Sequence, residues 1–261
     1  MSVTAPRGFR AAGVCAGSKS PGQRDIAVVV NDGPSRSAGG VFTENDDPAA
    51  PVLWSEQVIS GGRLRAVVLD SAAANSGTGL SGLQDVQVLA EHTAELLAGS
   101  THEIALCAAG PTGTRPNTVA ARHGVTTALG EAVRGGGLAA ADALRTNDTV
   151  AKIAFQRDDG VTVGGMAKGP DPSVSTALCL LTTDADLTED QCRHLAQAVT
   201  AEVFAPLTGT NDTVLCLASG CAEATGLGED GVHALMAKVC ADLAAQIFAD
   251  PPTTDDKQAH T

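Results

Sequence analysis

The sequence predicts a layered α/β sandwich (α/β or α+β), in which β-sheets pack against helices. Two observations support this: apolar runs of strand length recur along the chain, and stretches with helical spacing of apolar residues separate them. With 261 residues, 43% of them apolar, the chain can bury a full core as one large domain or two small ones. Only 2% of the residues are aromatic, so we expect a core of Ala, Val and Leu with helices close to the sheets.

Short apolar runs, bounded by turn residues, are predicted to be strands. They are residues 25–30, 40–43, 64–69, 103–108, 152–155, 162–166, 177–182 and 214–218.

Three longer segments show the apolar stripe of a helix. The first covers residues 82–98, and the last runs from Val232 to Ile247. Between them, Thr188 and Gln191 have the spacing of a capping box, which opens a helix with a stripe reaching Val203. Residues 251–261 contain one apolar residue and are predicted to be a disordered tail.

Charge and composition exclude several classes of partner. The net charge of −13 and the pI near 4.7 argue against binding to nucleic acid or to an anionic membrane. No apolar run approaches the ~20 residues that span a bilayer, and residues 1–10 lack the apolar core of a signal peptide. We therefore predict a cytoplasmic protein with no nucleic-acid or membrane partner.

The cysteines and histidines do not have metal-ligand spacing. The seven cysteines include no CxxC pair, and most lie within apolar runs, which favours buried, reduced thiols over disulfides or zinc ligands. The six histidines show no such spacing either. No metal site is predicted.

A glycine-rich run, residues 77–82, has the G-x-G-x-x-G pattern of dinucleotide-binding loops. Seven residues separate it from the preceding strand, where that fold needs a tight turn, and no acidic ribose ligand follows a second strand at the expected distance. Turn glycines that cap a helix are the better interpretation, so no cofactor is predicted.

The segment 164–184 suggests a nucleophile. A Pro/Ser loop delivers Thr176 to an apolar strand, and the Thr176 hydroxyl could attack the carbonyl of Ser175. Cleavage would leave Thr176 as an N-terminal threonine whose own α-amine serves as base. The alternative is a β-branched residue that simply opens a strand.

Blocks of sequence in constant order resemble the ornithine acetyltransferase family (ArgJ type, bifunctional glutamate N-acetyltransferase). They lie at residues 3–14, 39–43, 50–52, 65–68, 146–149, 164–169, 182–185 and 210–215. The resemblance implies the αββα sandwich of DmpA/ArgJ-like proteins. It also implies that residues 1–175 correspond to an α-chain and residues 176–250 to a β-chain of the same domain.

The resemblance implies roles for individual residues. Thr176 matches the self-cleaving nucleophile, so that the cleaved bond joins Ser175 to Thr176, and Lys168 and Thr146 match substrate-binding positions. The oxyanion-hole pair falls on Ala109 and Gly110, where the glycine matches but the family's threonine is replaced by alanine.

Other departures concern the loop and the C-terminal side. Residues 173–175 differ from the family pattern, and a Thr-Gly pair at 112–113 would reach the oxyanion position only after a register shift. Pro252 occupies the position of a substrate-binding glutamate, and the family's remaining C-terminal portion is absent.

Three functions therefore compete. The first is acyl transfer from N-acetylornithine to glutamate or a related small amine; the second is hydrolysis by the same threonine. The third is a non-catalytic relative, or a subunit whose site is completed by a partner polypeptide or by a homo-oligomer.

Three of the site motifs also have structural interpretations. Lys168 could neutralise a substrate carboxylate or be a solvated lysine at a strand end. Residues 146–149 could bind substrate or form an Asx-type turn. Asp212 could position a partner of Thr176 or cap a turn before the next strand.

Overall fold

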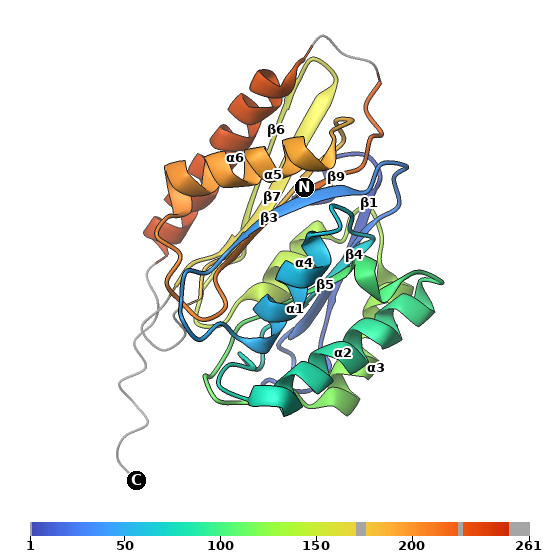
Figure 1. Ribbon diagram of the computed structural model, residues 1–261, viewed down its shortest axis with the longest axis vertical. Helices are drawn as coiled ribbons and strands as arrows, with labels where there is room; N and C mark the ends of the chain where they lie inside the picture. The colour runs from blue at the N-terminus through green and yellow to red at the C-terminus, as the bar shows by residue number, and fades with distance from the viewer. Residues whose placement is uncertain (1, 171–175, 224–226, 251–261) are drawn as a thin grey trace.

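The protein forms four layers, with two β-sheets face to face between two layers of helices (Figure 1). A computed structural model describes residues 2–170, 176–223 and 227–250. The arrangement confirms the predicted αββα sandwich. The tail 251–261 lies outside the described residues.

The first sheet has four strands in the order β1-β2-β4-β5. β4 and β5 are parallel, and the other neighbours are antiparallel. The strands are β1 (Phe9–Val14), β2 (Ile26–Asn31), β4 (Ala66–Asp70) and β5 (Ile104–Ala108).

The second sheet has five strands in the order β3-β9-β8-β7-β6. β8 and β9 are parallel, and the other neighbours are antiparallel. The strands are β3 (Ser37–Phe42), β6 (Lys152–Asp158), β7 (Val161–Lys168), β8 (Leu178–Thr183) and β9 (Thr213–Ala218).

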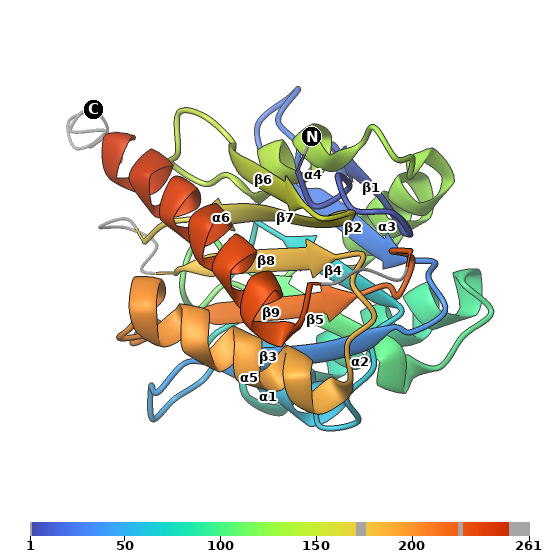
Figure 2. The same ribbon diagram turned by 90° about the horizontal axis from the view of Figure 1, so that it is seen from above.

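Helices cover the outer face of each sheet. α2 (Gly79–Leu96) and α3 (Thr118–Glu131) lie against the four-stranded sheet, whereas α5 (Glu189–Val199) and α6 (Glu229–Ala249) lie across the five-stranded one (Figure 2). A 3₁₀ turn (Thr101–Glu103) precedes β5, and a π-helical turn (Thr200–Phe204) follows α5.

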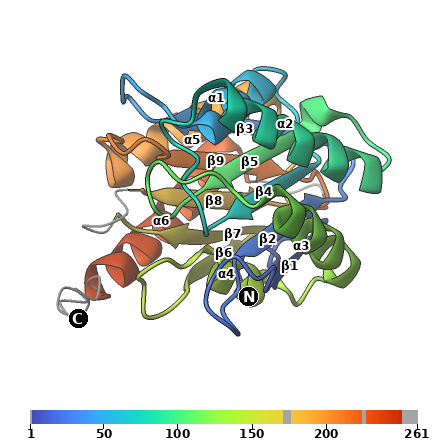
Figure 3. The ribbon, with the colours of Figure 1, turned by 90° about the horizontal axis from the view of Figure 1, so that it is seen from below.

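Two short helices flank the inner layer, as the view in Figure 3 shows. α1 (Ala50–Ile59) packs on β5, and α4 (Gly137–Leu144) packs on β1 and β2. Successive side chains of a strand point to opposite faces of its sheet. Alternate residues therefore pack either in the core between the two sheets or in a core between a sheet and its helices. In β4, for example, Val67 and Leu69 face the other sheet, while Val68 faces the outer helices.

The expected close packing of helices on sheets is confirmed at β3. A Cβ atom added at Gly39 would lie 2.4 Å from the Arg193 nitrogen of α5, well inside van der Waals contact. Only glycine permits this approach, so Gly39→Ala would force the helix away from the sheet.

Four elements escaped prediction: β1, α1, α3 and α4. The reason is clearest in α4, where five of the eight residues are buried, four of them small (Gly137, Ala140, Ala141, Ala143) together with Leu144. A helix buried on most of its surface does not show the one-sided stripe that marks an amphipathic helix.

α6 was expected as a helix, but its apolar character exceeds the expectation. By length and composition alone, its 21 residues could cross a membrane, with a mean hydropathy of 1.4 over the best window. Instead, its side chains Val239, Cys240 and Leu243 are buried in the core against the five-stranded sheet. A helix that forms part of a protein core passes the same compositional test, so the pattern is weak grounds for a membrane span.

The cysteines match the prediction of reduced thiols. All seven are free. Cys107, Cys179, Cys192, Cys216 and Cys240 are buried.

Candidate active site

Thr176 lies two residues before β8 and is 3% exposed. The residue that follows is held on two sides: the Ala177 amide donates to Asp212 Oδ1 at 2.7 Å, and its carbonyl accepts from the Thr213 amide at 2.9 Å. The backbone that carries the Thr176 hydroxyl is therefore fixed by the start of β9. The preceding residue, Ser175, lies outside the described residues.

Asp212 caps the turn before β9, as one of its two sequence interpretations expected, and also bonds the residue after Thr176. Oδ1 holds the Ala177 amide, and Oδ2 accepts from the Gly209 amide at 2.8 Å, which closes the turn before β9. Burial raises the pKa of Asp212, although the amides that it accepts and the charge of Lys168 oppose that rise. One carboxylate thus both caps a turn and positions the chain next to Thr176.

Lys168 ends β7 and is 1% exposed, which excludes the solvated lysine at a strand end. Its ammonium group donates to the Gly169 carbonyl at 2.7 Å and to the Thr176 carbonyl at 3.2 Å. The structure therefore places Lys168 directly against the backbone of Thr176.

The predicted oxyanion pair follows β5. Gly110 has φ +133°, and a Cβ atom there would lie 2.8 Å from the backbone of Ala72 and Ala73. The Ala109 amide donates to the Asp70 carbonyl at 2.8 Å, whereas the Gly110 amide donates to no other group among the described residues. The alternative pair is placed differently, because the Gly113 amide is bonded to the Ser76 carbonyl at 3.2 Å. Gly110 therefore carries the available N–H.

Thr146 lies in a turn between α4 and β6. Its amide donates to Asp148 Oδ2 at 3.1 Å, and Asp148 Oδ1 accepts from the buried Lys152 ammonium at 2.6 Å. Lys152 also pairs with Asp250 at the end of α6. The segment bends between α4 and β6, and the ion pair with the buried Lys152 holds Asp148 in place.

Thr146 and Gly110 line the same cavity, which has a volume of about 490 Å³. Thr176 and Lys168 lie outside its lining, so the three residues that match the family's nucleophile and substrate-binding positions do not share this cavity. Two hydrogen bonds link the segment next to Asp212 with the segment next to Gly110. Asn211, next to Asp212, donates to the Ala74 carbonyl at 2.9 Å, and the Ala74 amide contacts the carbonyl of Pro111, next to Gly110, at 3.4 Å.

Sequence analysis did not single out the charged residue of this cavity, Lys19. Its ammonium group reaches Ser71 Oγ and the Arg145 carbonyl, both at 2.5 Å. The only local signal was a lysine in a Ser/Gly-rich loop between two strands, a pattern that is common on protein surfaces. Long-range contacts, rather than a motif, give Lys19 its place.

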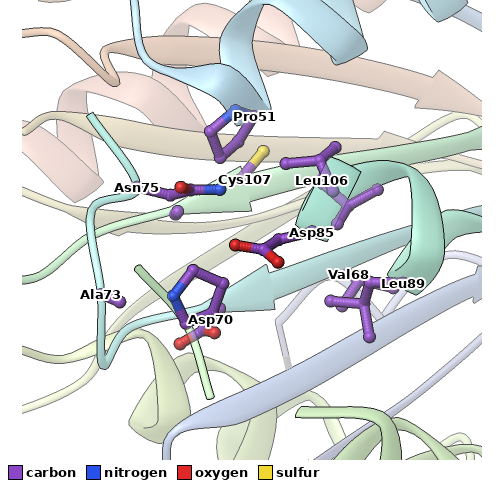
Figure 4. A pocket seen from close by; sticks show the side chains of 12 residues that line it. Pro51, Val68, Asp70, Ala73, Asn75, Asp85, Leu89, Leu106 and Cys107 are labelled. Atoms are coloured by element: carbon purple, nitrogen blue, oxygen red, sulfur yellow. The ribbon is translucent and has the colours of Figure 1, made fainter. Parts of the chain in front are cut away.

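The glycine-rich run at 77–82 forms a turn and the start of α2. Gly77 and Gly79 have φ values of +66° and +59°, and the Asn75 side chain donates to the Gly82 carbonyl at 3.0 Å. The cavity beneath this turn has a volume of only about 20 Å³, room for roughly one water. Figure 4 shows Asp70 and Asp85 among the side chains around it.

Comparison with known proteins identifies relatives across nearly the whole chain. The model of the ArgJ family matches residues 10–255. The arginine biosynthesis bifunctional protein ArgJ of Thermobifida fusca (strain YX) is 52% identical over 258 residues, which cover 96% of this chain and 67% of that relative.

Solved structures give two further similarities. The crystal structure of ornithine acetyltransferase complexed with ornithine from Mycobacterium tuberculosis is 45% identical, with a TM-score of 0.64. That match covers 67% of this chain and 96% of the solved chain. The L-aminopeptidase D-Ala-esterase/amidase of Ochrobactrum anthropi, described as a variant of the Ntn hydrolase fold, has a TM-score of 0.54 at 13% identity. It covers 96% of this chain and 86% of its own, and this likeness concerns the fold alone.

Proposed function

We propose that this chain, which belongs to the ArgJ family, is an N-acyltransferase. Its nucleophile would be the hydroxyl group of Thr176. It would pass an acetyl group from a donor such as N-acetylornithine to glutamate or a related amine. The observation that carries the proposal is the setting of Thr176: a buried threonine at the start of a strand, with Asp212 holding the next amide and Lys168 at its own carbonyl.

The nucleophile would first be freed by self-cleavage. The Thr176 hydroxyl attacks the Ser175 carbonyl, the peptide C–N bond breaks as the ester C–O bond forms, and the hydroxyl proton passes to the new α-amine. Water then hydrolyses the ester, which leaves a carboxylate on Ser175 and a free Thr176. The match to the solved acetyltransferase supports this position. It covers 67% of 261 residues, about 175, and nearly all of that solved chain. Residues 1–175, the fragment that cleavage between Ser175 and Thr176 would release, have the same length as the matched part.

Transfer would then follow in two steps. The Thr176 α-amine takes the hydroxyl proton as the oxygen attacks the acetyl carbonyl, and the donor's amine leaves with that proton. The acceptor's amine next attacks the acyl-enzyme, loses a proton to the α-amine and regenerates the threonine.

The Gly110 amide is suited to stabilise the negative charge that develops on the carbonyl oxygen in both steps. Ala109 provides no second donor, because it lacks a side-chain hydroxyl and its amide is bonded to Asp70. Since losing one oxyanion donor costs about 10²–10³ in rate, we expect slow cleavage and slow transfer.

Intact-mass spectrometry of the purified chain tests the nucleophile directly. We expect slow conversion to fragments of 175 and 86 residues, which together make up the 261. Thr176→Ala should stay intact. Thr208→Ala is the matched control, because Thr208 borders the same end of β9 but is exposed.

The cleaved protein should transfer label from acetyl-labelled N-acetylornithine to glutamate, and a chelator should have no effect. A wild-type chain that remains uncut and inactive after long incubation would favour the non-catalytic alternative. Release of free acetate without transfer would favour the hydrolase.

A further inference from the structure

The loop between β1 and β2 forms one wall of the 490 Å³ cavity and contributes Ser18, Lys19, Ser20 and Gln23 to its lining. Gly110 and Thr146 belong to the same lining. Lys19 is the one charged side chain among the described residues of this lining. In a chain with 30 acidic and 17 basic residues, a cavity with one cation and no carboxylate in its lining has the charge that attracts an anion.

A buried carboxylate holds this wall in place. Asp25, fully buried, accepts from the amides of Ala16 at 2.5 Å, Ser18 at 2.6 Å and Lys19 at 3.3 Å. Three backbone donors on one carboxylate fix the path of the loop through residue 19. The cation is therefore preorganised, and little conformational entropy remains to be lost when a ligand binds.

The ammonium group of Lys19 bonds three residues that lie far apart in the chain. Besides Ser71 Oγ and the Arg145 carbonyl, both at 2.5 Å, it contacts the Arg24 carbonyl at 3.3 Å. This last contact is the longest of the three, so it is the one that costs least to exchange for an anion. Arg145 directly precedes Thr146, which places the charge beside the predicted substrate-binding threonine.

Lys168 is placed differently. At 1% exposure, with its ammonium group against the Gly169 and Thr176 carbonyls, it serves the backbone around the nucleophile. The cation that faces the cavity is Lys19.

We propose that Lys19 and its loop form a carboxylate subsite of this cavity, which takes a small N-acyl amino acid with its free carboxylate against the Lys19 ammonium group. This inference rests on the proposed function, because it assumes that the cavity of Gly110 and Thr146 receives the substrate.

The titration of Lys19 allows a second, independent test of the subsite. Burial lowers the pKa of Lys19 to about 8, although the nearby carboxylates of Asp25, Asp70 and Asp142 oppose the shift and Arg145 adds to it. The amine is therefore charged at pH 7 and neutral at pH 9.5, where the subsite no longer attracts an anion.

The experiment compares N-acetylornithine with its α-carboxamide by calorimetric titration of the full chain. Charge-assisted hydrogen bonds predict that the wild type binds the carboxylate about 10–100-fold more tightly. Lys19→Met should reduce this preference to about threefold or less, whereas Lys19→Arg should keep it. A purely structural role would weaken both ligands alike, and a folded Lys19→Met chain that keeps the full preference overturns the subsite.

The pH dependence covers the case in which Lys19→Met does not fold. In the wild type the carboxylate preference should fall as the pH rises through about 8. In Lys19→Arg it should persist to pH 9.5, because arginine stays charged. A wild-type preference that is flat from pH 6.5 to 9.5 overturns the proposal. If the protein transfers acetyl groups but shows no Lys19-dependent preference for the carboxylate, the subsite is wrong and the proposed function stands. If it shows that preference but transfers no acetyl group, the proposed function is wrong and the subsite stands.

Discussion

The two sides of the candidate site are built in different ways. On the nucleophile side, Thr176 and Lys168 lie at the ends of β8 and β7, and strand register together with Asp212 sets their backbone. On the cavity side, Gly110, Thr146 and Lys19 lie on loops that are joined by contacts between residues far apart in the chain.

Under the proposed function, this difference separates the residues that react with the substrate from those that bind it. The reacting group needs a backbone that does not move, and a β-sheet provides it. The binding groups can vary with the substrate, which loops on a rigid scaffold allow without disturbing the core. The predictions below test whether the two sides are as independent as their construction suggests.

Removing the carboxylate of Asp212 should have the largest effect. Asp212→Ala leaves the buried amide of Gly209 and the partly buried amide of Ala177 without acceptors, at up to about 1–3 kcal/mol each, and frees the backbone after Thr176. We expect cleavage and transfer to fall at least about 100-fold, because misplacing a reacting group by about 1 Å can cost that much.

Asp184 is the matched control. It is also buried and also accepts two amides, from Thr162 at 2.7 Å and Arg7 at 3.1 Å, but it follows the other end of β8. Asp184→Ala should cost similar stability in urea denaturation while cleavage continues. Equal loss of cleavage in both variants would show that Asp212 acts only through stability.

Restoring the missing oxyanion donor should have the next largest effect. Ala109→Thr supplies a hydroxyl group beside Gly110. We expect cleavage and transfer to become about 10–100-fold faster, which approaches the rate gain of about 10²–10³ that one oxyanion donor provides. Ala109→Val has the same shape without the hydroxyl group, so the ratio of the two rates isolates the hydrogen bond from the strain of filling a buried position. Equal rates in the two variants would remove Ala109 from the oxyanion site.

The third prediction concerns stability, rather than rate, on the cavity side. Burial raises the pKa of Asp70 to about 6 from an ordinary value of 3.8. Because the folded pKa lies above the unfolded one, the stabilisation is complete below about pH 4 and is lost as the pH rises through 6. Asp70→Asn should therefore match the wild type near pH 4 and exceed it by about 2–3 kcal/mol at pH 7.

Urea denaturation at several pH values measures this difference. The asparagine keeps an oxygen that can accept from the Ala72 amide, as Asp70 does now at 2.8 Å. A gap between variant and wild type that does not change with pH would show that the charge of Asp70 is not the cause.

The same contrast explains what could be predicted from sequence. Periodicity located β8, and the capping box of Thr188 and Gln191 is present with both of its hydrogen bonds. The role of Lys19 could not be read in this way, because its partners Ser71 and Arg145 lie 52 and 126 residues away. Asp25 marked a strand start, but its three amide contacts depend on how the loop folds back.

The strand order of the five-stranded sheet has a consequence for assembly. β8 and β9 follow residue 175, yet they lie in the middle of the sheet, with β7 on one side and β3 on the other, both from the earlier part of the chain. A nick before Thr176 would therefore yield two polypeptides that cannot separate without tearing the sheet along both flanks. The five-stranded sheet is shared between the pieces, because residues before the nick supply β3, β6 and β7 and residues after it supply β8 and β9. Two separately expressed halves should therefore fold only in each other's presence.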